Sequence, residues 1–254
     1  MWPQGGVAAA TLTLGFGALG IAGIGILTLA VHPTWLVRIV QTRQRRVLFL
    51  DQRREKHELL VALTLDDGPH RDITHELLDI LEENHSKATW FLIGSNMDKC
   101  PEVVERIYKE GHEVGNHTMY DCASWRLSPE EFTAQLLATE RRLEPFFRKG
   151  EDGKPWKWFR PGHGFYNREM IDLVEGYGYK LVLGSLYPLD TLFRNKGKLI
   201  AKYLLWRVHP GAIIVLHDRE QQKIQTPEVL RVLLPELKRK GYSVVTIPEL
   251  LKLQ

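Results

Sequence analysis

Short apolar runs alternate with amphipathic stretches after residue 58, and this alternation constrains the fold more than any other feature of the chain. The apolar runs are rich in β-branched and aromatic residues or are flanked by Gly and Pro, as strands are. They cover residues 59–65, 88–94, 112–117, 156–161, 179–185, 211–217 and 242–247. The amphipathic stretches carry apolar residues at spacings of three and four, as helices do. They cover residues 74–84, 101–111, 128–147, 167–178 and 226–241. Strand–helix alternation predicts an α/β fold of parallel strands, either a barrel or an open doubly wound sheet.

A long apolar segment precedes this pattern. Residues 7–31 run for 25 positions without a charged side chain, and about 20 apolar residues span a bilayer as a helix. A cleaved signal peptide usually has an apolar core of about 7–15 residues behind a basic start, whereas residues 1–6 contain no Lys or Arg. A buried soluble helix is disfavoured by the length and by the five glycines. The segment is therefore predicted to be an uncleaved transmembrane helix that anchors a single-pass membrane protein.

Basic residues are concentrated directly after the apolar segment. Residues 1–57 contain two acidic residues and seven basic ones, namely Arg38, Arg43, Arg45, Arg46, Arg53, Arg54 and Lys56. The positive-inside tendency favours the cytoplasmic side for residues 38–254, although folded domains also cross membranes despite flanking charges. Such a cluster also suits contact with anionic lipid. Of the 34 basic and 31 acidic residues of the chain, 27 and 29 remain in residues 58–254, so this part is slightly acidic and is not expected to bind nucleic acid.

These features divide the chain into three segments. We predict a transmembrane anchor over residues 1–37, a basic juxtamembrane linker over residues 38–57 and one α/β domain over residues 58–254. The last segment has the usual size of a single domain. Cys100 and Cys122 are too few for a disulfide framework or a cysteine zinc site, although one bridge between them stays open. No protein partner is predicted.

Polar residues follow four of the predicted strands at the point where each strand ends. The four groups are Asp66 to His70, His117 to Asp121, Arg160 to Gly164, and His217 with Asp218. Each group alone has an ordinary structural explanation, because Asp and Gly are common in turns and a single histidine is more often structural than a ligand. In a barrel and in an open parallel sheet alike, however, active groups project from the carboxyl ends of the strands. Four such groups together predict a catalytic centre.

The sequences of these groups resemble one family. TLDDGP, HTMYD, RPGHG and IIVLHD follow one another in the order seen in the polysaccharide deacetylases of carbohydrate esterase family 4, the NodB-homology domain. The resemblance covers nearly everything after residue 58, including the closing stretch over residues 226–251. It implies a distorted (β/α) barrel of about seven units. It also implies an enzyme that removes N- or O-acetyl groups from glycans such as chitin oligomers, peptidoglycan and xylan with the help of a divalent metal.

The resemblance also implies a set of metal ligands. Asp67 and His117 match the first two ligands, and Asp121 falls where the family usually has a second histidine. A metal at such a site activates water and polarises the carbonyl of the substrate. A set of two carboxylates and one imidazole is harder and more anionic than the usual one, which favours Mn²⁺, Mg²⁺ or Fe²⁺ alongside Zn²⁺. Zn²⁺ is the expected ion, and Mn²⁺, Co²⁺, Fe²⁺ or Ni²⁺ are alternatives. The alternative to a working site is a weakened or empty one.

The catalytic roles are likewise carried over from the family. Asp66 matches the general base, and Arg160 matches the arginine that orients it. His217 matches the general acid, a role that suits imidazole near neutral pH. Asp190 matches the aspartate that tunes this acid. The backbone amide of His163, where the family often has tyrosine, is expected to help bind the oxyanion.

Two positions near the expected site differ from the family. Thr191 replaces a usual tryptophan of the acetyl pocket, and Val215 replaces a leucine of its apolar wall. The resemblance predicts a hydrolase of carbon–nitrogen bonds, with chitin or chitin-like N-acetylglucosamine oligomers as the expected glycan. The alternatives are a deacylase of a lipid-linked or other non-polysaccharide amide and a non-catalytic sugar-binding relative. Retention of both the base and the acid favours an enzyme.

Overall fold

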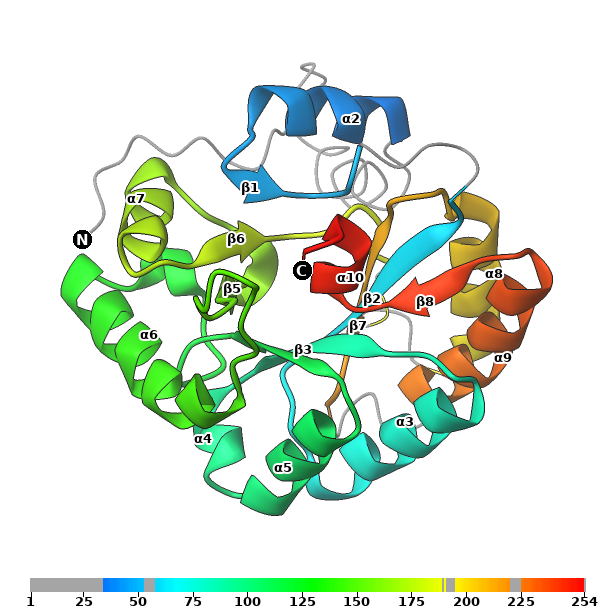
Figure 1. Ribbon diagram of the computed structural model, residues 1–254, viewed down its shortest axis with the longest axis horizontal. Helices are drawn as coiled ribbons and strands as arrows, with labels where there is room; N and C mark the ends of the chain where they lie inside the picture. The colour runs from blue at the N-terminus through cyan, green and yellow to red at the C-terminus, as the bar shows by residue number, and fades with distance from the viewer. Residues whose placement is uncertain (1–33, 53–57, 189, 191–194, 220–224, 254) are drawn as a thin grey trace, which may run out of the picture.

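Seven parallel strands form a curved sheet at the centre of the molecule (Figure 1). The computed structural model describes residues 34–52, 58–188, 190, 195–219 and 225–253. The strands lie in the order β1 (Val47–Leu48), β6 (Lys180–Val182), β5 (Trp158–Phe159), β4 (Glu113–Asn116), β3 (Ala88–Leu92), β2 (Leu60–Asp66) and β7 (Ile213–His217). An eighth strand, β8 (Ser243–Val245), pairs with β2 beside this path. The parallel strands form an α/β half-barrel, and the predicted α/β barrel class is confirmed to this extent.

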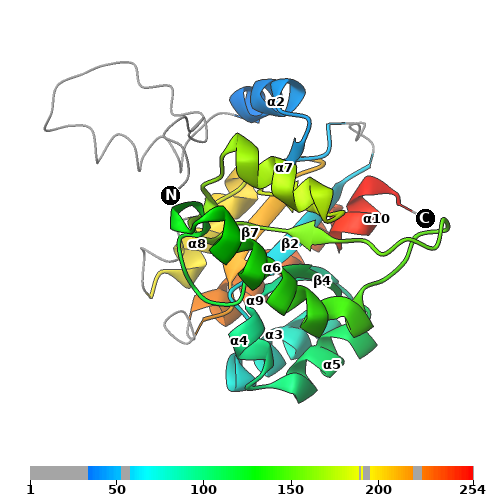
Figure 2. The ribbon, with the colours of Figure 1, turned by 90° about the vertical axis from the view of Figure 1, so that its left-hand side faces the viewer.

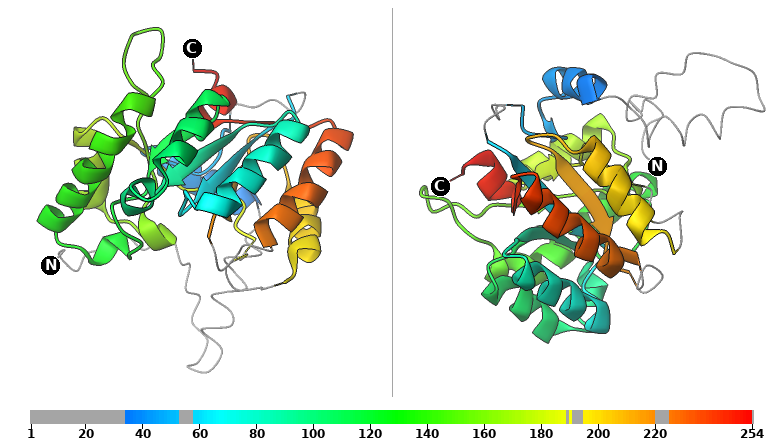
Figure 3. Two further views of the ribbon diagram at one scale, coloured as in Figure 1. Left: turned by 90° about the horizontal axis from the view of Figure 1, so that it is seen from below. Right: turned by 90° about the vertical axis from the view of Figure 1, so that its right-hand side faces the viewer.

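Helices lie around the outer side of the sheet (Figures 1 and 2). They are α2 (Thr34–Arg43), α3 (Arg71–Glu83), α4 (Gly94–Met97), α5 (Pro101–Lys109), α6 (Pro129–Leu143), α7 (Arg168–Gly176), α8 (Gly197–Arg207) and α9 (Gln225–Arg239). A further helix, α10 (Ile247–Leu251), instead lies at the centre of the curved sheet (Figure 1) and packs into an apolar cluster there. Short 3₁₀ turns lie at η1 (Ser124–Arg126), η2 (Glu144–Phe146) and η3 (Gly162–Gly164). Helices α8 and α9 pack side by side (Figure 3). The sequence sets such boundaries locally. Helix α6 begins with a capping box, in which the side chains of Ser128 and Glu131 each accept a bond from the other residue's backbone amide.

The central strands are buried on both faces. All five residues of β3 are buried, and its apolar side chains divide between two clusters because successive strand residues point to opposite faces. Trp90 joins the large cluster between the sheet and the helices, whereas Phe91 joins a smaller cluster inside the curve of the sheet. Burial on both faces explains why the strands appear in the sequence as continuous apolar runs. The core thus holds the strand ends in a fixed arrangement.

Part of the predicted linker belongs to the sheet. β1 lies within residues 38–57 and pairs with β6, and the side chain of Val47 is fully buried. Arg46 pairs with Asp172 and Glu175 of α7 at 2.6 and 2.7 Å. This part of the basic cluster therefore contacts protein carboxylates. The strand was missed because two residues are too short for a periodic pattern, and the domain boundaries stay a prediction.

The prediction of a single-pass membrane protein requires correction. Among the described residues, no helix is both long enough and apolar enough to cross a bilayer. The expected transmembrane segment over residues 7–31 lies outside the described part of the chain. The expected membrane localisation and membrane contact therefore have no support in the structure. Cys100 and Cys122, whose pairing was left open, are both free.

Candidate active site

The register of two neighbouring strands brings Asp66 and His217 together. β2 and β7 are parallel, and Asp66, the last residue of β2, lies directly opposite His217, the last residue of β7. The backbone amide of Asp218 then donates to the carbonyl of Asp66 at 2.8 Å. The Asp66 side chain is 6% exposed and that of His217 is 22% exposed. The expected base and acid are thus adjacent because the sheet pairs the residues that carry them.

A buried arginine holds the Asp66 carboxylate. Arg160 follows β5, and its Nη1 lies 2.6 Å from Asp66 Oδ1 and 2.7 Å from the hydroxyl of Thr64. The other guanidinium nitrogens donate to the carbonyls of Val182 and Leu183, and the Phe91 ring lies 4.1 Å from the guanidinium carbon. Buried charges need such partners because they have lost water. Arg160 therefore has one permitted position, and it fixes the carboxylate in turn.

His217 is polarised by Asp190. Its Nδ1 lies 3.0 Å from both carboxylate oxygens of Asp190, and its backbone amide donates to the same carboxylate at 3.2 Å. Burial alone would lower the pKa of His217, but attraction and hydrogen bonding to Asp190, with smaller contributions from Asp67 and Asp66, raise it to about 9. The imidazole is therefore protonated at neutral pH. Gln225, at the start of α9, donates to the Asp190 carbonyl and secures the segment that carries the carboxylate.

Asp67 and His117 form a second pair beside the first. His117 Nε2 lies 3.4 Å from Asp67 Oδ1, and His117 Nδ1 lies 2.7 Å from the carbonyl oxygen of Arg160. Because a carbonyl oxygen only accepts, Nδ1 carries a proton and Nε2 is directed at Asp67. Burial opposes ionisation of Asp67, but the hydrogen bond with His117 and attraction to His117, His217 and Arg219 lower its pKa to about 2. Burial also opposes protonation of His117, but the Asp67 and Asp66 carboxylates raise its pKa.

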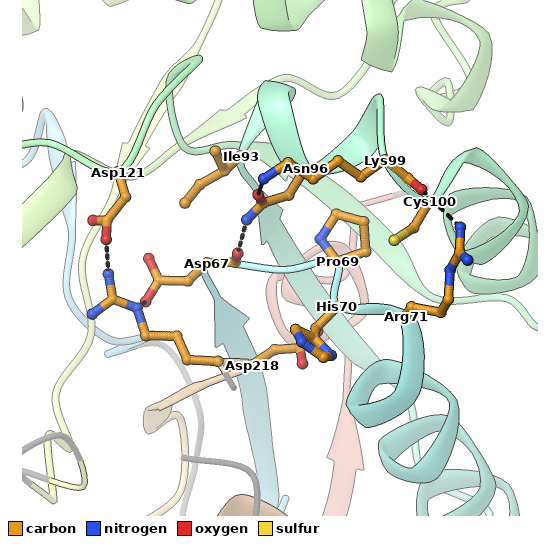
Figure 4. A pocket seen from close by; sticks show the side chains of 11 residues that line it. Asp67, Pro69, His70, Arg71, Ile93, Asn96, Lys99, Cys100, Asp121 and Asp218 are labelled. Carbon is orange, nitrogen blue, oxygen red and sulfur yellow. Dashed lines mark hydrogen bonds and ion pairs between the residues drawn. The ribbon is translucent and has the colours of Figure 1, made fainter. Parts of the chain in front are cut away.

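Asp121 does not join this pair, so the predicted set of three metal ligands is not assembled. The Asp121 side chain is 52% exposed, and its carboxylate accepts a bond from Nη2 of Arg219. Arg219 Nε also lies 2.6 Å from Asp67 Oδ2. Figure 4 shows Asp67 and Asp121 along one side of a pocket, with the contact of Asp121 drawn. No group of three His, Cys, Asp or Glu residues that could hold a metal occurs in the described part of the chain. As arranged, the residues do not fit a three-ligand metal site.

The expected oxyanion residue lies on a tight turn at the edge of the site. His163 has φ 63, in the left-handed region, and is exposed. The preceding Gly162 is required by close packing, because a Cβ there would lie 2.1 Å from the carbonyl oxygen of Cys122. Its amide donates to the hydroxyl of Ser124 at 2.8 Å. The turn is therefore held against the η1 segment, with His163 directed toward the cavity that it helps to line.

Two cavities meet at the site. One of about 500 Å³ contains the expected catalytic groups, and its lining includes Asp66, His117, Arg160, His163, Phe165, Tyr187, Val215 and His217. The other, of about 530 Å³, lies over Pro69, His70, Arg71, Asn96 and Lys99. Asp67, Asp121 and Arg219 line both cavities. Val215 is thus at the cavity wall, as expected, whereas Thr191 lies outside the described residues.

Sequence reasoning missed two residues of the site. Arg219 stands two positions after His217, just beyond the end of β7. Its place directly after a strand end was a usable signal for a charged group in the cavity. Tyr187 lines the catalytic cavity, and burial raises its pKa. It lies on the segment between β6 and α8, where no strand or helix pattern placed it.

Comparisons with known proteins assign the chain to a family. Residues 53–182 match the family described as polysaccharide deacetylase. The chain is 33% identical over 197 residues to a peptidoglycan-N-acetylglucosamine deacetylase of Bacillus cereus, with 77% of this chain and 90% of that protein covered. It is 29% identical over 201 residues to a chitooligosaccharide deacetylase of Bradyrhizobium, with 75% and 90% covered.

The fold is similar to a solved structure as well. The crystal structure of the Bc1960 peptidoglycan N-acetylglucosamine deacetylase, in complex with 4-naphthalen-1-yl-N-oxidanyl-benzamide, is similar to this one with a TM-score of 0.74 at 28% identity. The match covers 84% of this chain and 96% of that one. The matched family spans half of the sequence, and the match to the Bacillus cereus deacetylase covers 77% of it. The chain belongs to the polysaccharide deacetylase family.

Proposed function

We propose that this protein is a deacetylase that removes acetyl groups from N-acetylglucosamine units of a glycan, either peptidoglycan or chitin-like oligomers. The observation that carries the proposal is the placement of Asp66 opposite His217 in the register of β2 and β7. Each member of this pair has its own buried partner, Arg160 for Asp66 and Asp190 for His217. The relatives named above act on substrates of this class, which supports the choice of glycan.

The proposed reaction divides the proton transfers between the two residues. The Asp66 carboxylate takes a proton from water, whose oxygen attacks the carbonyl carbon of the acetamide. A tetrahedral intermediate forms with negative charge on the former carbonyl oxygen, and the backbone amide at His163 is proposed to stabilise it. Protonated His217 donates its proton to the amide nitrogen. The carbon–nitrogen bond then breaks, giving acetate and a free amine on the sugar.

An exposed aromatic pair supports a sugar polymer as the substrate. Phe165 lines the catalytic cavity and is 46% exposed, and its ring lies 6.1 Å from that of Trp125, which is 40% exposed. The guanidinium of Arg126 lies 5.0 Å over the Trp125 ring. Aromatic side chains that remain exposed at a cavity commonly form part of a binding site. A glycan chain longer than one sugar would extend from the cavity over this pair.

Acetate release from purified protein tests the proposal. We expect acetate from N-acetylglucosamine oligomers or peptidoglycan, and the Asp66→Asn variant should lower the rate by about 1000-fold or more. Asparagine keeps an oxygen that can accept from Arg160, so folding should be largely retained. Asp152→Asn, in an exposed loop, is the matched control and should behave like the parent. Release from acetylated xylan alone would assign the enzyme to esters instead, and no release with any added divalent metal would reject the proposal.

One observation favours a second candidate, a non-catalytic sugar-binding protein. Arg219 contacts both Asp67 and Asp121, so the predicted ligands are not free to act together. A protein of this kind would bind N-acetylglucosamine oligomers without releasing acetate, and Asp66→Asn would leave the affinity unchanged. The two candidates are therefore separated by measuring oligomer binding and acetate release on the same sample.

A further inference from the structure

Arg219 occupies the centre of the anionic part of the site. Its Nε lies 2.6 Å from Asp67 Oδ2, and its Nη2 donates to Asp121 Oδ2. A guanidinium is suited to this bridge because its donors form a rigid planar fork that can engage two carboxylates at once. The Asp67 side chain is 7% exposed and its charge therefore needs a partner. Arg219 supplies that partner from a position just beyond the end of β7.

Half of a metal site is nevertheless already formed on the other side of Asp67. Asp67 Oδ1 and His117 Nε2 are 3.4 Å apart. Two ligand atoms that each lie about 2.0–2.1 Å from a tetrahedrally bound zinc ion are separated by about 3.4 Å. His117 Nδ1 is held by the Arg160 carbonyl, which directs Nε2 as metal-bound histidines require. Asp67 and His117 therefore have the spacing and orientation of two metal ligands.

The guanidinium and a divalent ion compete for Asp67. An ion bound between Oδ1 of Asp67 and Nε2 of His117 would share one small carboxylate with the guanidinium that contacts Oδ2. Two cations that contact the same carboxylate repel each other strongly in a partly buried site. The Arg219 side chain is able to move away from Asp67, because it is 29% exposed and lines both cavities. Asp121 is more exposed still and can move with it.

We propose that Arg219 is a built-in cation that competes with a divalent metal for Asp67, and that Asp121 anchors Arg219 instead of serving as a metal ligand. The inference rests on the proposed deacetylase function and adds a control of metal entry to the same site. Metal binding requires the Arg219 side chain to leave Asp67. Asp121, which stands where the family usually has a histidine, then holds the arginine that competes with the metal.

Metal affinity measured without substrate tests this inference. Isothermal titration of the metal-free full chain with Zn²⁺ and with Co²⁺ gives the affinity of the parent and its variants. Arg219→Gln should bind each ion at least about 10-fold more tightly than the parent, because the competing cation is gone. Asp121→Asn weakens the anchor of Arg219, so its metal affinity should equal or exceed that of the parent. Arg71→Gln removes an exposed positive charge from the same cavity wall and should leave the affinity unchanged.

Three results would overturn the inference. Arg219→Gln could bind no more tightly than the parent, Arg71→Gln could tighten binding as much as Arg219→Gln does, or Asp121→Asn could lose 10-fold or more in affinity, as a lost ligand would. Should Arg219→Gln fail to fold, Arg219→Lys serves, because its single ammonium cannot bridge two carboxylates and should give an intermediate gain.

These results are separable from failure of the proposed function. Tight metal binding by Arg219→Gln with no acetate release from any variant would reject the deacetylase and keep the competition. Acetate release by the parent, together with an unchanged metal affinity in Arg219→Gln, would keep the deacetylase and reject the competition.

Discussion

The two ends of β4 carry buried histidines whose pKa values are shifted in opposite directions. His112, directly before the strand, is 1% exposed, and burial with the nearby cations Lys87, Arg148 and Arg106 lowers its pKa to about 3. Its Nδ1 accepts a bond from the amide of Ala88 at 3.1 Å, as a neutral imidazole can. His117, directly after the strand, is 6% exposed, yet the carboxylates of Asp67 and Asp66 raise its pKa.

The acidic residues of the two ends differ in the same way. Burial raises the pKa of Glu113, the first residue of β4, to about 8, whereas the charges around Asp67 lower its pKa to about 2. Burial is similar at both ends, so the difference comes from the neighbouring charges. The amino end of the strand keeps its titratable groups neutral, as a stable core does. The carboxyl end keeps them charged, and charged groups of both signs are what proton transfer requires.

Of the substitutions that test this difference between the two ends of β4, removal of the buried Arg160 guanidinium should have the largest effect on stability and activity. Arg160→Met leaves Asp66 buried without its ion-pair partner, and breaking such a pair typically costs about 3–5 kcal/mol. We expect the free energy of unfolding to fall by that amount and acetate release to fall by about 1000-fold. Chemical denaturation and a rate assay measure the two effects. Arg148→Met, near the amino end of β4, is the control, and equal losses in the two variants would show that the ends do not differ.

Preventing the ionisation of Glu113 at the amino end should change the free energy of unfolding less, and in the opposite direction. The pKa of Glu113 is about 8 in the folded chain against 4.5 for an ordinary glutamate. The protonated form therefore contributes stability that is complete below about pH 4.5 and is lost as the pH rises through about 8. Glu113→Gln cannot ionise and should be more stable than the parent at pH 9 by about 2–4 kcal/mol, with little difference at pH 4.5. A difference between Glu113→Gln and the parent that stays constant across pH, measured by thermal unfolding, would contradict the assignment. Glu102→Gln, at an exposed position of α5, is the control and should show no pH-dependent difference.

Removing the negative charge of Asp190, which contacts His217, should have the smallest effect on activity. Attraction to Asp190 is the largest influence that raises the pKa of His217 to about 9. Activity that depends on protonated His217 should be complete below that value and fall as the pH rises through it. In Asp190→Asn the falling limb of the pH–rate profile should move down by one to two pH units, which is a loss of about 2- to 10-fold at pH 8. An unmoved limb would assign it to another group.

The sequence predicted the half-barrel well because its central strands are buried on both faces and its main helices are amphipathic. It missed α8, which exposes Leu199 and Trp206 and so lacks a clean apolar face. It missed β1 because two residues give no period. Strand register is a long-range property, yet strand ends alone were enough to group Asp66 with His217. The conformation of the loops beyond those ends depends on tertiary contacts, which is why the role of Arg219 and the separation of Asp121 were not foreseen.

A double-mutant cycle on acetate release tests the central claim most directly. If Asp66 and His217 act as one unit across β2 and β7, Asp66→Asn and His217→Gln should each remove most of the activity toward N-acetylglucosamine oligomers. The double variant should then be nearly as active as the weaker single variant, with the rates measured in the same buffer and at metal saturation. Losses that multiply, so that the double variant falls by the product of the two single effects, would mean that the residues act independently and would contradict the proposed pair.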